Sequence, residues 1–184
     1  MNVSGERIFD APRGTVWQVL NDPESMAKTM PGVESFDVHD DRHWTANVKI
    51  PLGLGGMKMK VDMEKIEERE PEFAKLSVKG NGVGAMMNME TSFTLSDADG
   101  GGTSMAWSAE VKILGPVGSM GQRVLQPIVN QQVQHVLTAL EVQVQQAAGS
   151  GGGPAAHGAE EGISPASPEA YEADPEGPTT STED

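Results

Sequence analysis

Apolar residues recur at two different spacings along the 184 residues, and the change of spacing separates a strand-rich region from one long helix. Between residues 43 and 113 they alternate with polar residues, which is typical of antiparallel strands with one buried face. The alternating stretches cover residues 43–50, 57–64, 74–78, 87–95 and 103–113. Residues 2–9 predict a further strand, and Pro12 and Pro23 open two short predicted helices after it.

The last stretch of this pattern, about residues 115–148, has apolar residues at helical spacing and almost no charge after Gln122. One stripe of this helix would contain Leu125, Val129, Val133, Val136, Leu137, Leu140 and Val144. A helix of about thirty residues spans roughly 45 Å at about 1.5 Å per residue. The order of elements predicts an α+β helix-grip fold, in which a curved antiparallel sheet of about six to seven strands surrounds a long C-terminal helix.

The composition changes at about Gly149, where Gly, Pro, Ser and Ala become dominant. The segment that follows carries eight acidic residues and no Lys or Arg, so it supplies −8 of the formal net charge of −14. It buries too little apolar surface to offset its chain entropy, and residues 149–184 are therefore expected to be disordered. This tail is either a solubilising extension or a partner-binding segment. The helix-grip domain is expected to cover residues 1–148.

Several functional classes are disfavoured by composition. The chain has no cysteine, which excludes disulfides and thiolate chemistry, and its four histidines lack the spacing of metal ligands. The acidic balance argues against nucleic-acid binding. We find no signal peptide and no apolar run of membrane-spanning length, so we expect a cytoplasmic protein whose membrane contact is peripheral. Without a catalytic or metal motif, an enzymatic use of the fold is a minor alternative.

Methionine is concentrated on the predicted inward face of the strands. The chain holds 11 Met but only 4% aromatic residues. Methionine side chains are long and adaptable, and they favour surfaces that accept an irregular apolar guest. This face is either a solid core or the wall of a ligand cavity between sheet and helix. The residues predicted to line such a cavity are Met57, Met59, Met63, Met87, Met89, Phe93, Met105, Trp107, Leu125, Val129 and Val133.

The connection at residues 51–56 is rich in glycine and has leucines at its tip. Loops normally expose polar side chains, so these leucines indicate either a lid that folds over the core or a surface that contacts a bilayer or a partner. Lysines close by suit anionic lipid headgroups. The candidate lid and contact residues are Leu52, Gly53, Leu54, Lys58 and Lys60.

Four short motifs carry a resemblance to a known family. They are Pro12 followed by VWQVLNDP at residues 16–23, MPGVES at 30–35, the glycine-rich junction at 80–84, and RVLQPIVN at 123–130. Over about residues 1–147 the chain resembles the CoxG family of carbon monoxide dehydrogenase subunits, which belongs to the START-like (SRPBCC) superfamily. The resemblance implies the helix-grip fold, with a long cavity, and a membrane-associated accessory protein without known catalysis. Some members of the family end in a hydrophobic membrane segment, whereas this chain ends in an acidic tail.

The resemblance and the methionine face together predict a non-catalytic partner of a molybdenum hydroxylase, the carbon monoxide dehydrogenase. That enzyme would release electrons in the cytoplasm, while isoprenoid quinones reside in the bilayer. We therefore expect the apolar ligand to be a respiratory quinone, menaquinone or ubiquinone, with no covalent cofactor, and Trp107 and Phe93 are candidates to face its headgroup. The alternative is a structural adaptor that recruits or assembles the dehydrogenase at the membrane without carrying a ligand.

Overall fold

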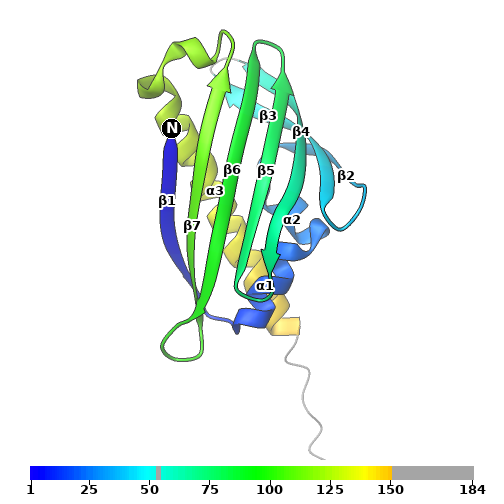
Figure 1. Ribbon diagram of the computed structural model, residues 1–184, viewed down its shortest axis with the longest axis vertical. Helices are drawn as coiled ribbons and strands as arrows, with labels where there is room; N and C mark the ends of the chain where they lie inside the picture. The colour runs from blue at the N-terminus through cyan, green and yellow to red at the C-terminus, as the bar shows by residue number, and fades with distance from the viewer. Residues whose placement is uncertain (53–54, 151–184) are drawn as a thin grey trace, which may run out of the picture. The chain divides into compact units, whose positions relative to one another are not determined.

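The computed structural model describes residues 1–52 and 55–150 of the chain. Within these residues, seven strands form one antiparallel sheet that packs against a long helix, as Figure 1 shows. The elements are β1 (Asn2–Phe9), α1 (Arg13–Asn21), α2 (Pro23–Thr29), β2 (Val33–Val38), β3 (His43–Leu52), β4 (Gly55–Arg69), β5 (Phe73–Gly82), β6 (Ala85–Asp97), β7 (Thr103–Leu114), the 3₁₀ turn η1 (Gly118–Met120) and α3 (Gln122–Ser150). The predicted helix-grip arrangement is confirmed.

The sheet follows the order β1-β7-β6-β5-β4-β3-β2, so the first strand closes against the last one. Helix α3 crosses one face of this sheet, and α1 and α2 pack beside α3 near the end where α3 finishes (Figure 1). The opposite face is mostly polar. Successive side chains of a strand point to opposite sides, and polar residues occupy most of the outward positions. On β6, Glu90 lies on this outer face and its Oε2 accepts from Lys75 Nζ of β5 at 2.8 Å.

Strand β2 is not delimited by the sequence pattern. Its residues do not alternate between buried and exposed, since only Val33 and Phe36 are half-buried. It lies at the edge of the sheet, where it pairs with β3 alone and has a register shift between Val33 and Ser35. An edge strand with one neighbour and an irregular register needs no strict alternation, so the periodicity contains no clear signal for it.

The long helix begins later than predicted, at Gln122 instead of about residue 115. Gly115 and Gly121 have positive φ angles of 86° and 82°, which turn the backbone out of a helical path before α3 starts. At its other end α3 runs to Ser150, slightly past the predicted end at Ala148. Of the tail predicted from Gly149, residues 151–184 lie outside the described part of the chain.

The buried apolar residues form two separate clusters. One joins α1 and the C-terminal half of α3 to the sheet, and its fully buried members include Phe9, Val16 and Val144. The other belongs to the middle strands, β3 to β6, and consists of Ala46, Val48, Met59, Val61, Val78 and Ala85. A core that is divided in this way leaves space between its halves, and the candidate site lies there.

Candidate ligand cavity

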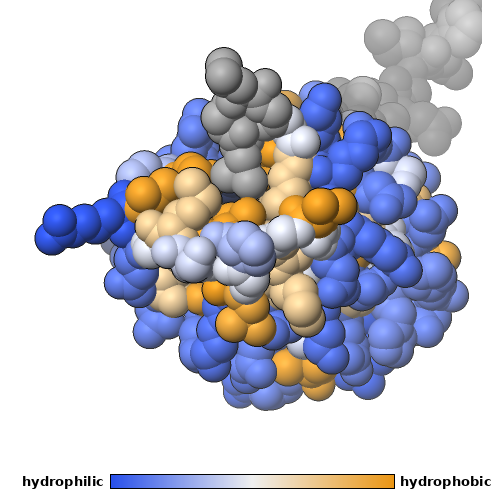
Figure 2. All heavy atoms as spheres, turned by 90° about the horizontal axis from the view of Figure 1, so that it is seen from above, coloured by the Kyte–Doolittle hydropathy of each residue, from blue (hydrophilic) through white to orange (hydrophobic). Residues whose placement is uncertain are grey.

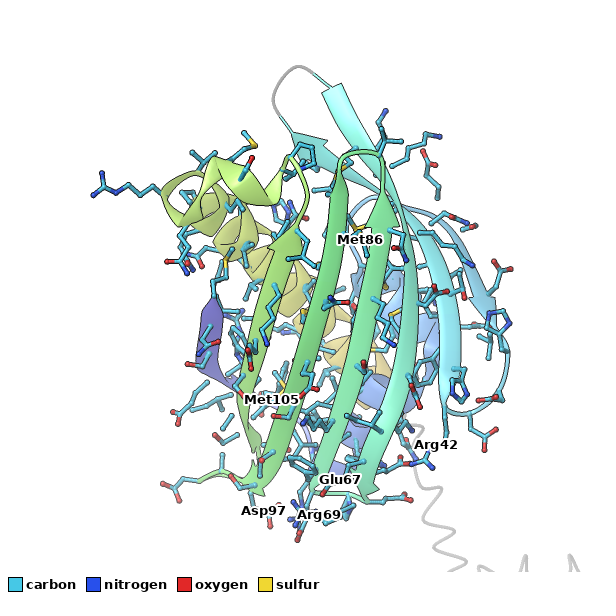
Figure 3. The ribbon with its side chains drawn as sticks, turned by 45° about the horizontal axis from the view of Figure 1, so that its top comes forward. Arg42, Glu67, Arg69, Met86, Asp97 and Met105 are labelled. Atoms are coloured by element: carbon cyan, nitrogen blue, oxygen red, sulfur yellow. The ribbon has the colours of Figure 1, made fainter. Side chains whose placement is uncertain are left out.

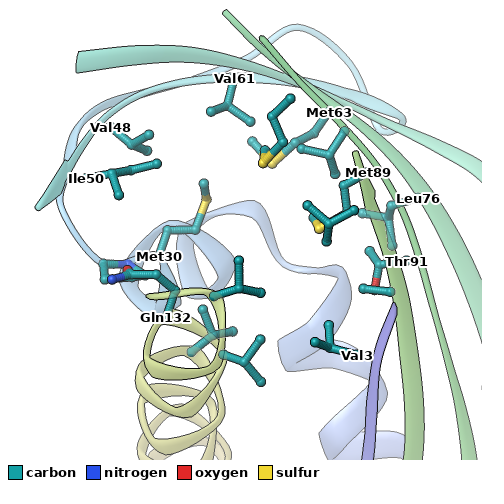
Figure 4. A pocket seen from close by; sticks show the side chains of 18 of the residues that line it. Val3, Met30, Val48, Ile50, Val61, Met63, Leu76, Met89, Thr91 and Gln132 are labelled. Atoms are coloured by element: carbon teal, nitrogen blue, oxygen red, sulfur yellow. The ribbon is translucent and has the colours of Figure 1, made fainter. Parts of the chain in front are cut away.

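A cavity of about 400 Å³ lies between α3 and the inner face of the sheet (Figure 4). Its wall includes residues from every described strand except β2, from all three α-helices, and from the connections, where Met30, Pro31 and Val117 contribute. The lining side chains are almost all apolar, and the size lies within the range of pockets that enclose small organic ligands. The space is therefore suited to an apolar molecule.

All eleven residues predicted to line a cavity lie on this wall. They are Met57, Met59, Met63, Met87, Met89, Phe93, Met105, Trp107, Leu125, Val129 and Val133. The inward methionines thus border an open space, and most of those on β4 and β6 are only half-buried. Their role in binding a ligand stays a prediction.

Helix α3 provides one side of the cavity along four turns. Its lining residues are Leu125, Ile128, Val129, Gln132, Val133, Val136, Leu137 and Leu140. The stretch from the first to the last of them is about 22 Å long at about 1.5 Å per residue. Ile128, Val129, Gln132 and Val136 are outside both core clusters, so within the described residues this part of the helix faces the cavity itself. The site is therefore elongated along the helix axis.

Short helix α2 and the residues after it form a part of the wall that the sequence pattern did not predict. Met26, Thr29, Met30 and Pro31 all line the cavity, as does Leu20 of α1. Met30 and Pro31 stand within the MPGVES motif, directly after α2, and Met26 lies on α2 four residues before Met30. These are readable signals of a second wall opposite the strands.

Four polar residues take part in the wall, and three of them have partners within the protein. Thr29 Oγ1 donates to the Met26 carbonyl at 2.7 Å, Thr91 Oγ1 donates to the Ser108 carbonyl at 3.0 Å, and Ser92 Oγ is 3.3 Å from Ser108 Oγ. The fourth is Gln132, whose side chain forms no hydrogen bond with another described residue. In Figure 4, Gln132 lies beside Met30 at one edge of the cavity.

The two aromatic candidates for a headgroup contact, Trp107 and Phe93, are held at the end of the cavity nearest α1. Phe93 packs edge-on against Trp17, with ring centroids 6.0 Å apart and planes inclined by 62°. The indole of Trp107 covers Gly5, its cross-strand partner, where an added Cβ would lie 3.0 Å from the ring. Trp107 Nε1 is buried and has no acceptor among the described residues.

The predicted lid lies only partly within the described residues. Gly53 and Leu54 lie outside the described residues, as does the side chain of Leu52. Lys58 and Lys60 lie on the exposed face of β4, where Lys58 Nζ is 3.0 Å from Glu34 Oε2 and Lys60 Nζ is 3.6 Å from Asp62 Oδ1. Both lysines therefore have acidic neighbours, although exposed ion pairs of this kind are weak.

Exposed apolar side chains lie together at the end of the sheet where β3 ends and β4 begins. We call five of them the apolar end, and they are Val83, Met86, Leu114, Met120 and Val124. They come from the β5–β6 turn, β6, β7, η1 and α3. Met86 is opposite Leu114 in the sheet, and the Val117 amide donates to the Gly84 carbonyl at 3.0 Å, which ties these segments together. Figure 3 places Met86 near this end, and Figure 2 views the end from above.

Neither a metal cluster nor a membrane-spanning helix is present in the described part of the chain. No group of three His, Cys, Asp or Glu side chains within residues 1–52 and 55–150 is arranged to hold a metal ion. In the same residues, no helix combines the length and the apolar character needed to cross a membrane.

Solved structures share this fold. A conserved protein from Geobacillus kaustophilus superposes with a TM-score of 0.75 at 20% identity, over 80% of this chain and 97% of that one. A START superfamily protein from Mycobacterium smegmatis gives a TM-score of 0.62 at 16% identity, over 79% and 97%. A protein from Thermus thermophilus gives 0.60 at 18% identity, over 80% and 99%. At these identities the likeness establishes the START-like helix-grip fold.

The sequence itself provides a more specific comparison. No curated protein matches this chain significantly. The family model for the G subunit of carbon monoxide dehydrogenase (CoxG), however, matches residues 5–145, which run from within β1 to near the end of α3. The matched region holds every residue of the cavity wall except Val3. The chain therefore belongs to the CoxG family of carbon monoxide dehydrogenase subunits.

Proposed function

We propose that this protein is a non-catalytic accessory of a molybdenum carbon monoxide dehydrogenase that carries a respiratory quinone between the membrane and the enzyme. The apolar cavity between α3 and the sheet is the observation that supports this proposal most strongly. Family membership supports the accessory role beside the dehydrogenase. The START-like fold supports binding rather than catalysis, because its long helix and curved sheet enclose an apolar space.

An isoprenoid quinone requires such a carrier if it is to leave the bilayer. Each CH₂ group moved from an apolar medium into water costs about 0.8 kcal/mol, so a long tail does not cross water unaided. The cavity extends along four turns of α3 and is lined by methionines, which adapt to a branched chain. In the proposal, the quinone tail lies along the axis of the helix.

The apolar end supports contact with the membrane. Val83 is 93% exposed, and Met86, Leu114 and Met120 are each 50–52% exposed. Single exposed apolar side chains are ordinary, but a group of them on one surface marks a contact with a partner or a membrane. Met87, Ile113 and Val117 line the cavity and are adjacent in sequence or structure to this surface. In the proposal, a quinone enters the cavity from the membrane at this end.

The structural adaptor remains the second candidate, and the apolar end is the observation that favours it. An adaptor would use the same surface to recruit the dehydrogenase and would leave the cavity empty. The two functions predict different results for the ligand bound to the purified protein. Native mass spectrometry and organic extraction of the protein from its own host are expected to yield a bound quinone. A clean unliganded mass, together with normal binding to the dehydrogenase, would establish the adaptor instead.

A substitution in the cavity tests the carrier directly. Met89→Glu places an unpaired charge on the apolar wall, so we expect the extracted quinone to fall by about tenfold or more. Asn88→Glu is the matched control, because Asn88 is the preceding residue of β6 and lies on the exposed face. It is expected to retain the wild-type content. Wild-type quinone content in a folded Met89→Glu protein would contradict the proposal.

A further inference from the structure

Gln132 is an exception in the apolar stripe of α3. It follows Ile128 and precedes Val136 by four residues each, and all three line the cavity. Residues four apart share one face of a helix, so the stripe places an amide where an apolar side chain would be expected. The other seven lining residues of α3 are all apolar.

The Gln132 amide also differs from the other polar groups of the wall. Thr29 and Thr91 donate their hydroxyl protons to backbone carbonyls, whereas the amide of Gln132 has no hydrogen-bond partner among the described residues. A polar group that faces an apolar space without a partner is unfavourable. Gln132 lines the cavity beside Met30, on the side opposite Thr91 (Figure 4), so its amide is within reach of a molecule that occupies this part of the cavity.

Trp107 is a weaker candidate for the same task. Its Nε1 is also without an acceptor among the described residues, but it is fully shielded and the ring covers Gly5. A ligand would reach this N–H only if the indole moved. Gln132 is half-buried and lines the cavity.

We propose that the Gln132 side chain is the hydrogen-bonding group for the polar head of the ligand, and that it binds both redox forms of a quinone through different atoms. A quinone oxygen only accepts, whereas a hydroquinone hydroxyl also donates. A glutamine amide has two N–H donors and a carbonyl acceptor, so it provides a partner for either form. This inference rests on the proposed carrier function and adds the residue that orients the headgroup.

The test measures dissociation constants for three probes by equilibrium dialysis. Decylubiquinone and, without oxygen, decylubiquinol are the two redox forms, and decylbenzene has the same tail without oxygen atoms. Gln132→Met keeps the length of the side chain but removes its hydrogen bonds. We expect it to bind both quinone forms about three- to tenfold more weakly. Decylbenzene should bind at least as tightly as to the wild type, which also shows that the cavity is intact.

Two further variants complete the experiment. Gln132→Glu offers only acceptors when ionised, so it is expected to discriminate against the quinone more strongly than against the hydroquinone. Gln134→Met is the control, because Gln134 is exposed on the same helix and should bind all probes as the wild type does. Unchanged binding of all three probes to Gln132→Met would overturn the role of Gln132 alone. If the wild type bound none of them, the carrier function itself would fail.

Discussion

Asp22 shows how one residue stabilises a wall of the cavity. It ends α1 and caps α2, where its carboxylate accepts from the Ser25 amide at 2.9 Å and from the Ser25 hydroxyl at 2.6 Å. The hydroxyl hydrogen bond is the main reason that the pKa of Asp22 lies below its ordinary value. Because α2 contributes Met26 and Thr29 to the wall, this cap supports the site as well as the helix.

We expect the loss of this cap to lower the stability of the fold in a way that depends on pH. Asp22→Ala is expected to lower the free energy of unfolding by about 1 kcal/mol at pH 7. A carboxylate with a lowered pKa stabilises the fold above its unfolded pKa, near 3.8, and this contribution disappears as the pH falls through the folded value. Asp22→Asn keeps an acceptor and should be nearly as stable as the wild type at pH 7, with less dependence on acid. Urea unfolding at about pH 7 and pH 3 measures both effects, and equal losses for Ala and Asn would contradict them.

At the scale of elements, the sequence contains most of the fold because alternation and helical spacing are direct consequences of burial. Strands β1 and β3 to β7 and the apolar stripe of α3 follow from these periods. Strand β2 has no alternation, and the start of α3 depends on the backbone angles of Gly115 and Gly121, which a hydrophobic pattern does not contain. The strand wall of the cavity is therefore predictable, whereas the wall formed by α2 depends on how two short helices pack.

The arrangement of apolar rows on α3 explains why the sequence pattern does not identify Gln132 as a site residue. The predicted stripe passes through Val129 and Val133, and the adjoining row of Ile128, Gln132 and Val136 belongs to it only in part. In the structure both rows line the cavity. A cavity beside a helix borders a broader strip of the helix surface than a close contact with one neighbouring element does. A polar residue inside the second row is the sequence signal for the headgroup position that we propose.

Helix α3 also allows the empty space to be tested by filling it. Val129 lines the cavity and lies outside both core clusters, so Val129→Phe can occupy part of the space. We expect the free energy of unfolding to rise by about 0.5–2 kcal/mol while quinone binding weakens. Such opposite changes are characteristic of a cavity kept open for function. Val142→Phe, on the exposed side of α3, is the control and should change neither quantity. A destabilised Val129→Phe protein with normal binding would show that the cavity does not take the ligand.

At the scale of the whole described domain, exposed apolar groups are unevenly distributed. Ile8, Val38, Ile66 and Val142 are also exposed, but they lie on separate elements away from the apolar end. The apolar end, in contrast, brings together five exposed side chains from several elements at one end of the sheet. Figure 2 views this end from above. Because Lys58 and Lys60 have acidic partners, we expect membrane contact to depend on apolar burial more than on charge.

Charged substitutions in the apolar end test its contact with the membrane. Val83→Asp combined with Met120→Asp should weaken sedimentation with phosphatidylcholine–phosphatidylglycerol vesicles by about tenfold or more, since burying one such side chain contributes about 1.5–3 kcal/mol. Both positions are exposed, so the fold and the binding of decylubiquinone in solution should be unchanged. Ile8→Asp is the matched control, because Ile8 is 68% exposed on β1 outside the apolar end. Moderate salt should have little effect on the wild type, as apolar contact is not screened. Vesicle binding that is lost in salt but retained by the double variant would assign the membrane contact to charged residues instead of the apolar end.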